Sequence, residues 1–377
     1  MHLPHATTYR GLYPTLPQPQ VHKTEIAVEA PMQGHADFDE LRRRAGAKAP
    51  GEDDRKRYAA HQFAQQNLSR VFASCEKNAV RDRAAALKAV APYLLPGDIP
   101  DKFLDRLVTE LQDGRLTINV DLRRFDLESF ENSGGRYTNK FDRAVPASRE
   151  RDPYARAQFE DRLFRMGELY ASSPHAAQGR FFNADGNRNA EFHHESRPIY
   201  AALDFVKDPG GGAHSYGRSY AVLSDGLKHA ATFLPQDSLL YLDLPDLGHL
   251  STLFHFENLI ARLPDSRYGH SLMKQLVHQV RTRGQASSPT PPVSLGDRMQ
   301  GYRPRPDRHY GQQNNYIDAS VHATVSFRDF QEIHLSMGEL RERYPDPVRR
   351  DTFIHAVMRF DAEHRARRGR ALFHFHE

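Results

Sequence analysis

Two carboxylic acids stand out in residues 316–336, "YIDASVHATVSFRDFQEIHLS", a stretch that alternates as a pair of strands would. On the first strand Asp318 shares a face with Tyr316 and His322, whereas the apolar side chains between them point the other way. Glu332 opens the following strand, and a hairpin would bring it to the same cleft. Paired carboxylates can stabilise a developing positive charge and accept a proton. The alternative is a solvated strand face on which the acids are incidental.

Other residues of reactive type give weaker patterns. The runs "HHE" at 193–195 and "HFHE" at 374–377 resemble metal ligands but lack partners at helical spacing, so we expect no metal site. The glycines at 210–212 precede a strand rather than a helix, which predicts a turn and not a phosphate-binding loop. Cys75 falls in a helical pattern and is expected to be a small core residue.

Composition narrows the class of protein. The chain has 377 residues, and its 52 Lys and Arg against 48 Asp and Glu are interleaved, which argues against a nucleic-acid partner. It shows neither a membrane-spanning apolar run nor the apolar core of a secretory signal peptide. A single cysteine excludes an internal disulfide framework, so a reducing destination such as cytosol is allowed.

Three regions follow one another along the chain. Residues 1–52 are rich in Pro, His, Gln and Gly and are expected to be a disordered leader that serves delivery. Residues 53–113 carry helical patterns that predict three helices, and residues 114–377 carry the remaining elements. A polar, Pro-rich loop is expected at 284–315.

The third region predicts short, irregularly spaced strands interrupted by two helices, at 154–172 and 271–283. This pattern is typical of an α+β fold with a mixed or antiparallel sheet. The strands are expected within 115–122, 197–206, 215–223, 231–235, 238–244, 316–327 and 331–336.

Several motifs, taken in order, resemble those of the DUF3626 family. They are "RLTINVDL", "GGRYTNKF", "AQFEDRLFRMGELY", "SRPIYAALDF", "YGRSYAVL", "ATFLPQDS", "YIDASVHATVSFRDFQEIHL" and "LRERYPDPVRR", and together they cover roughly residues 115–356. That family contains CteC-like bacterial effectors, which are similar to PARP-like ADP-ribosyltransferases and modify a threonine of host ubiquitin.

The resemblance implies a PARP-like fold, NAD as co-substrate, and a bacterial effector that passes by type III secretion into the host cytosol and blocks ubiquitination. CteC-like enzymes use an Asp and Glu pair, which fits Asp318 with Glu332, while Asp237 competes for the aspartate role. The family commonly has glutamate where this chain has Asp318.

The chemistry of ADP-ribose transfer suggests roles for these acids. We assign Glu332 to stabilising the positive charge on the ribose and holding its hydroxyl. We assign Asp318, with Asp237 second, to taking the proton of the acceptor hydroxyl.

Five further residues are candidates for binding NAD. Tyr200, Tyr216 and Tyr220 lie on predicted strands and could form an aromatic wall for nicotinamide, with core packing as the alternative. Arg197 or Arg218 could pair with the pyrophosphate, with a surface salt bridge as the alternative.

Three classes of protein remain open from the sequence. The leading one is a mono-ADP-ribosyltransferase, expected to be a monomer, whose helical region 53–111 and loop 284–315 offer surfaces for ubiquitin. The second is a non-catalytic module on the same scaffold that binds a host protein, favoured by the aspartate at 318. The third is a glycosidase, made less favourable because the chain has no Trp for sugar stacking.

Overall fold

The structure is a computed structural model that describes residues 52–122, 163, 198–237, 247–285, 316–323, 325 and 329–377. Several predicted segments lie outside these residues: the leader up to residue 51, the "GGRYTNKF" motif, the helix at 154–172 apart from Leu163, the "HHE" run, the strand at 238–244 and the loop from residue 286 to 315.

The chain enters the fold through two helices. Helix α3 (Glu52–Val90) runs into a short 3-10 turn, η1 (Ala91–Tyr93), and α4 (Pro100–Gln112) follows. The prediction of three helices was wrong, because its first two form the single helix α3. Between Glu52 and Pro92 the chain has neither Gly nor Pro, so no such residue breaks the helical hydrogen bonds. The predicted start of the last helix at Pro100 is confirmed.

In the described part of the chain, eight strands form one sheet in the order β5-β4-β6-β2-β1-β3-β7-β8. Their bounds are β1 (Arg115–Val120), β2 (Ile199–Asp204), β3 (Ser219–Leu223), β4 (Ala231–Leu234), β5 (Ser251–Thr252), β6 (Ile317–Val321), β7 (Phe330–Ser336) and β8 (Phe373–His376). Only β7 and β8 run parallel; the other neighbours are antiparallel. The expected α+β class with a mixed sheet and a helical N-terminal region is therefore confirmed.

The predicted hairpin of β6 with β7 does not form. Strand β6 is hydrogen-bonded to β2 on one side and to β4 on the other, so it has no free edge for β7. Strand β7 lies instead between β3 and β8, and three strands separate it from β6. The expectation that a hairpin brings Glu332 to the cleft of Asp318 was wrong for this reason.

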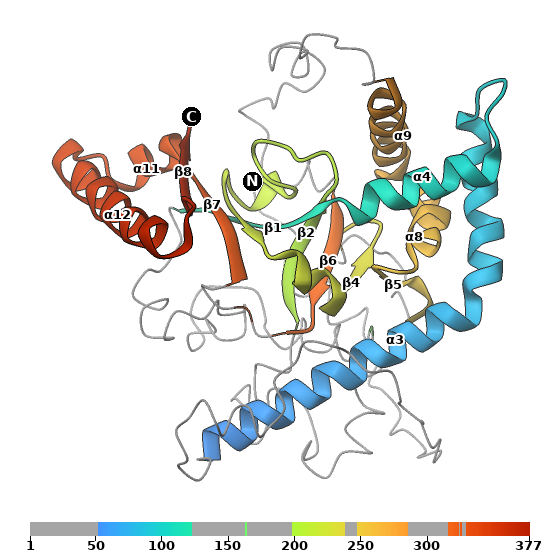
Figure 1. Ribbon diagram of the computed structural model, residues 1–377, viewed down its shortest axis with the longest axis horizontal. Coiled ribbons are helices and arrows are strands. Elements are labelled where there is room, and N and C mark those ends of the chain that lie inside the picture. The colour runs from blue at the N-terminus through green and yellow to red at the C-terminus, as the bar shows by residue number, and fades with distance from the viewer. Residues whose placement is uncertain are drawn as a thin grey trace, which may run out of the picture.

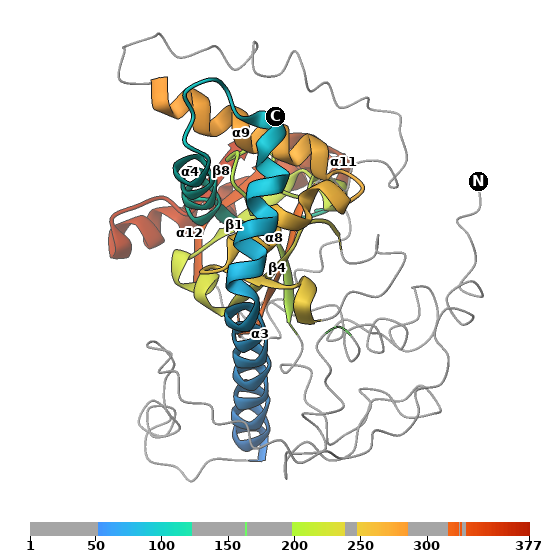
Figure 2. The same cartoon turned by 90° about the vertical axis from the view of Figure 1, so that its right-hand side faces the viewer.

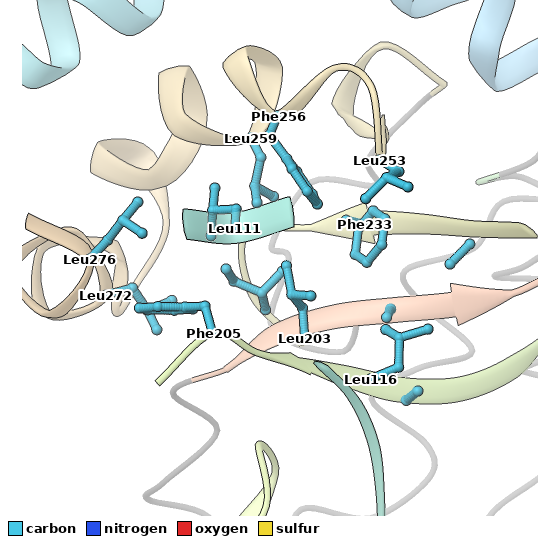
Figure 3. Close-up of a cluster of buried hydrophobic side chains, with 14 of the residues drawn as sticks. Leu111, Leu116, Leu203, Phe205, Phe233, Leu253, Phe256, Leu259, Leu272 and Leu276 are labelled. Carbon is cyan, nitrogen blue, oxygen red and sulfur yellow. The ribbon is translucent and has the colours of Figure 1, made fainter. Parts of the chain in front are cut away.

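Helices cover the apolar face of the sheet. Helices α4, α8 (Phe256–Arg262) and α9 (Gly269–Gln285) gather near the C-terminal end of α3 (Figures 1 and 2). Their buried side chains join those of the strands in one cluster, in which Phe233 lies 5.0 Å from Phe256 between ring centroids (Figure 3). The helical region and the sheet thus share a hydrophobic core. Since α9 ends at Gln285, the first two residues of the predicted loop are helical.

Two further helices close the fold at the β7–β8 end. Helix α11 (Met337–Arg343) is preceded by the N-cap Ser336, and α12 (Pro347–Arg368) is followed by the C-cap Gly369, whose φ of 74° favours glycine. Their apolar side chains pack with Leu335 and Phe375 of the sheet. The remaining elements are the 3-10 turns η3 (His214–Tyr216), η4 (Asp225–Ala230), η6 (Leu247–His249) and η7 (Leu263–Asp265).

None of the helices in the described part of the chain is both long enough and apolar enough to cross a membrane. Cys75 is buried and donates to the Leu250 carbonyl, which confirms its prediction as a core residue.

Candidate functional site

The face of the sheet opposite the helices carries the polar side chains. Asp318 and Glu332 both lie on it, in one cross-strand row that runs from Asp318 through Ala202, Thr117 and Val222 to Glu332. That row spans four strand spacings of about 4.8 Å each, or about 19 Å. The two acids therefore cannot act on the same atom.

A loop lies across the middle of this face. The Asn119 side chain donates to the carbonyls of Gly210 and Gly217, at 2.7 and 3.0 Å, and the Gly212 amide donates to the Thr117 hydroxyl at 2.9 Å. Gly211 has a φ of +79°, and a Cβ there would lie 2.7 Å from the Asn119 amide oxygen. We call residues 205–218 the partition loop, because it separates the Asp318 side of the polar face from the Glu332 side.

Gly210 and Gly211 belong to a tight turn, as predicted, and Gly212 follows it. The Gly211 amide donates to the carbonyl of Asp208 at 3.0 Å, and the loop then packs flat on β1. Their missing side chains permit this close approach, which gives them a structural reason that needs no phosphate.

On one side of the partition loop, two acids and two tyrosines form what we call the acid–tyrosine cluster: Tyr216, Asp237, Tyr316 and Asp318. The Tyr216 hydroxyl donates to Asp237 Oδ2 at 2.9 Å and lies 3.5 Å from the Tyr316 hydroxyl. Asp237 and Asp318 are 2% and 4% exposed, whereas Tyr216 is 46% exposed. Tyr216 is thus the most exposed of these three residues.

Different elements position the members of the cluster. Asp318 lies within β6 and is flanked by β2 and β4, so its backbone is held on both sides. Asp237 follows the end of β4 by three residues. Tyr216 ends η3, and Gly217 after it has a φ of +142°, with its Cα so close to Val120 that any side chain would collide with the carbonyl there. This glycine lets the chain turn sharply into β3 and leaves the Tyr216 ring beside Asp237.

Burial and negative charge act together on the tyrosines. Burial, followed by the charge of Asp237, raises the pKa of Tyr216, and burial followed by the charges of Asp318 and Asp237 raises the pKa of Tyr316. Both phenols consequently keep their protons around neutral pH. Tyr216 donates to the Asp237 carboxylate, and Tyr316 donates to the Tyr216 hydroxyl.

The other side of the partition loop holds a stack of rings. Tyr220 and His334 stack with centroids 4.3 Å apart, and His374 stacks on His334 at 4.9 Å. We call these three residues the histidine stack. Glu332 lies 2.9 Å from Nε2 of His334, and this hydrogen bond is the main cause that lowers the pKa of Glu332. Burial lowers the pKa of His334, against the opposing effect of Glu332.

Arg115 lies beside the histidine stack and forms an ion pair with Asp204. Arg115 donates from Nε to Asp204 Oδ2 at 2.9 Å and from Nη2 to the Asp208 carbonyl at 2.6 Å. Its guanidinium lies 5.4 Å from the centroid of the Tyr220 ring. Since Asp204 is buried and ion-paired, we regard this arginine as a structural support of the partition loop.

The structure brings together three of the eight residues predicted for the site: Asp318, Asp237 and Tyr216. Glu332 and Tyr220 lie beyond the partition loop, so Tyr220 cannot share one aromatic wall with Tyr216. Tyr200 is half-buried on β2, next to Ser320 of β6. Arg197 lies outside the described residues.

Arg218 lies two residues beyond Tyr216 and is exposed. Its backbone amide donates to Glu339 Oε1 at 2.7 Å, and its guanidinium lies beside Gly338 of α11. The side chain is thus directed toward α11 rather than along the acid–tyrosine cluster.

Two structurally important residues were not proposed from the sequence. Tyr316 is two residues before Asp318 on the same strand face, so alternation alone could have added it to the site. Glu339 is 3% exposed and accepts hydrogen bonds from the amides of Arg218 and Ser219 and from the Ser219 hydroxyl. Nothing short of the tertiary structure indicates that role.

His322 confirms the predicted polar face of β6. It lies just past the strand, is buried, and its Nε2 lies 3.0 Å from the Thr232 hydroxyl. Burial lowers its pKa to about 3, so the imidazole is neutral. Within the described ranges, no group of three or more His, Cys, Asp or Glu side chains is placed to hold a metal ion.

No family model matches the chain, and no curated protein matches it either.

Proposed function

We propose that this protein is an NAD-dependent mono-ADP-ribosyltransferase that modifies a protein hydroxyl, with a threonine of ubiquitin as the first acceptor to test. The observation that carries the proposal is the meeting of Asp237, Asp318 and Tyr216 on the polar face of the sheet. Asp318 occupies the position at which the DUF3626 family commonly has glutamate. That departure favours the non-catalytic alternative, whereas the ordered motifs that resemble the DUF3626 family support a PARP-like ADP-ribosyltransferase fold and a bacterial effector that acts in the host cytosol.

The two aspartates take the roles first divided between Asp318 and Glu332. Asp318, held within β6 by strands on both sides, stabilises positive charge on the ribose, because a preorganised carboxylate does so without reorganisation. Asp237 lies beyond the end of β4 beside the half-exposed Tyr216, where an acceptor would arrive. It accepts the proton of the acceptor hydroxyl.

In this reaction the acceptor oxygen bonds to the anomeric carbon of the ribose. The bond from that carbon to nicotinamide breaks, its electron pair stays with the nicotinamide nitrogen, and the hydroxyl proton passes to Asp237. The chain supplies charge stabilisation, orientation and a proton acceptor.

The groups of the cluster fit the nicotinamide and ribose end of NAD. Its carboxylates suit ribose hydroxyls and a cationic ring, and the half-exposed Tyr216 offers an aromatic face. A guanidinium for the pyrophosphate would come from Arg197 or from a reoriented Arg218.

The experiment is to incubate the purified protein with NAD and ubiquitin and to record the intact mass of ubiquitin. We expect the mass of one ADP-ribose to be added, at a rate that falls by about 10²–10⁴ in Asp237→Asn and in Asp318→Asn. Glu332→Gln is the matched control, because it neutralises a carboxylate on the same face beyond the partition loop. Circular dichroism checks that all three variants fold.

Each outcome decides between the alternatives. Loss of activity in Glu332→Gln with retention in both aspartate variants would overturn the assignment of the site. Absence of any mass gain, together with binding of ubiquitin that survives both aspartate substitutions, would favour the non-catalytic binding module.

A further inference from the structure

Tyr316 is the buried tyrosine of the acid–tyrosine cluster and contacts Tyr216. It immediately precedes β6, is 6% exposed, and packs with Ala202 and Ala213 on the polar face of the sheet. The small side chains of the two alanines leave room for its ring against the sheet. Its position is thus set by the sheet and by the partition loop.

Two contacts connect Tyr316 to Tyr216. The rings meet edge to face, with centroids 6.1 Å apart and planes at 82°, and the hydroxyls lie 3.5 Å apart. Tyr216 in turn donates to Asp237. A buried ring therefore supports an exposed ring, and the exposed ring holds a buried carboxylate.

The direction of this chain of hydroxyls is fixed. Because Asp237 is an acceptor, the Tyr216 proton points to it, and the Tyr216 oxygen is left to accept from Tyr316. Oδ2 of Asp237 accepts the Tyr216 proton, so the orientation of the carboxylate depends on where the Tyr216 hydroxyl lies.

Tyr216 needs such support. It lies at the end of a three-residue turn and is 46% exposed, so a tyrosine there without a neighbour would rotate about its side-chain bonds. An aromatic wall contributes more to binding when its plane is fixed before the ligand arrives, because less side-chain entropy is then lost.

We propose that Tyr316 is a positioning residue: its ring fixes the plane of Tyr216, and its hydroxyl, acting through Tyr216, orients the Asp237 carboxylate. The inference rests on the proposed function, since it assigns a role within that reaction. The role has two parts, one for the ring of Tyr316 and one for its hydroxyl, and different substitutions remove each part.

The test compares two variants of Tyr316 in steady-state transfer and NAD hydrolysis. Tyr316→Phe keeps the ring and removes the hydroxyl, so kcat should fall by about threefold to tenfold, the size of one neutral hydrogen bond, with an unchanged KM for NAD. Tyr316→Leu also removes the edge that faces Tyr216, so KM for NAD should rise as well. Tyr93→Phe is the matched control, because it removes a tyrosine hydroxyl that lies 2.8 Å from His270 outside the cluster.

A double-mutant cycle separates positioning from a general effect on stability. If the Tyr316 hydroxyl acts through Asp237, Tyr316→Phe should lower kcat in the wild type and have no further effect in Asp237→Asn. Equal effects in both backgrounds, or a kcat for Tyr316→Phe no lower than that of Tyr93→Phe, would overturn the inference while leaving the proposed function intact. A wild-type protein that neither transfers ADP-ribose nor hydrolyses NAD would overturn the proposed function, and the inference with it.

Discussion

Glu339 offers the sharpest test of how the start of β3 is held. Its Oε1 accepts from the Arg218 amide at 2.7 Å, and its Oε2 accepts from the Ser219 hydroxyl at 2.8 Å and the Ser219 amide at 3.2 Å. The Ser219 hydroxyl in turn accepts from the Ser336 amide at 2.9 Å. Ser336 and Glu339 thus form a Ser-x-x-Glu capping box at the start of α11, in which the hydroxyl of Ser219 on β3 links the Glu339 carboxylate to the Ser336 amide.

The perturbation is Glu339→Gln. An amide nitrogen replaces one accepting oxygen, so one buried donor loses its partner, at a cost of about 1.5–3 kcal/mol for a bond to a charged group. The remaining bonds become neutral and roughly half as strong, which brings the expected loss to about 3 kcal/mol. For a fold of this size we expect a fall in Tm of about 6–12 °C.

Thermal unfolding followed by circular dichroism measures this loss. Glu332→Gln serves as the control, because the Glu332 side chain is 43% exposed and its hydrogen bond with His334 should contribute about 1 kcal/mol or less. A fall of less than about 2 °C in Glu339→Gln, comparable with the control, would refute the reasoning that this carboxylate holds the start of β3.

Three other predictions concern a glycine, the thiol and an imidazole. Gly211→Ala should lower the urea midpoint more than Gly97→Ala, because both have positive φ but only at Gly211 would the new Cβ collide with side chains beneath it; equal shifts would contradict this. Burial raises the pKa of Cys75 to about 12, so a disulfide reagent at pH 8 should label the thiol only in denaturant, and rapid labelling of the native protein would count against its burial. The pKa of His334 lies below its usual 6.5, so its contribution to stability is complete above pH 6.5 and is lost as the pH falls through the folded pKa. Glu332→Gln removes the group that opposes this shift, so the imidazole signals in nuclear magnetic resonance should titrate at still lower pH; titration at higher pH would contradict the assigned contact.

Alternation along the sequence correctly predicted which way the side chains of β6 face. Asp318 and His322 lie on the polar side, and Ile317 and Val321 lie in the core. Period-two alternation reports the face of a strand, but it carries no information about which strands are neighbours. The acids were paired incorrectly for that reason.

Chain length also failed to exclude the true connection between β6 and β7. The eight residues from His322 to Asp329 can extend across about 30 Å, more than the four strand spacings that separate the two strands. A short link in sequence is thus compatible with either a hairpin or a crossing. The choice is made by tertiary hydrogen bonds, in which β2 and β4 occupy both edges of β6.

The terminal run at 374–377 shows how composition can obscure a strand. Its histidines resemble metal ligands, although no metal site was expected there, and the run was not among the predicted strands. In the structure Phe373 and Phe375 alternate with His374 and His376 along β8. The phenylalanines pack with the apolar residues of the β7–β8 end, and His374 stacks on His334. Four residues are too few to distinguish this alternation from a cluster of ligands until β7 supplies the neighbouring strand.

The partition loop has a consequence for the evolution of this chain. Substitutions separated by more than about 10 Å and sharing no partner usually have additive effects. Asp318 and Glu332 lie about 19 Å apart on opposite sides of the loop, so substitutions at these two acids should have additive effects. Residues around one of these acids can thus change during evolution without altering the selection on residues around the other.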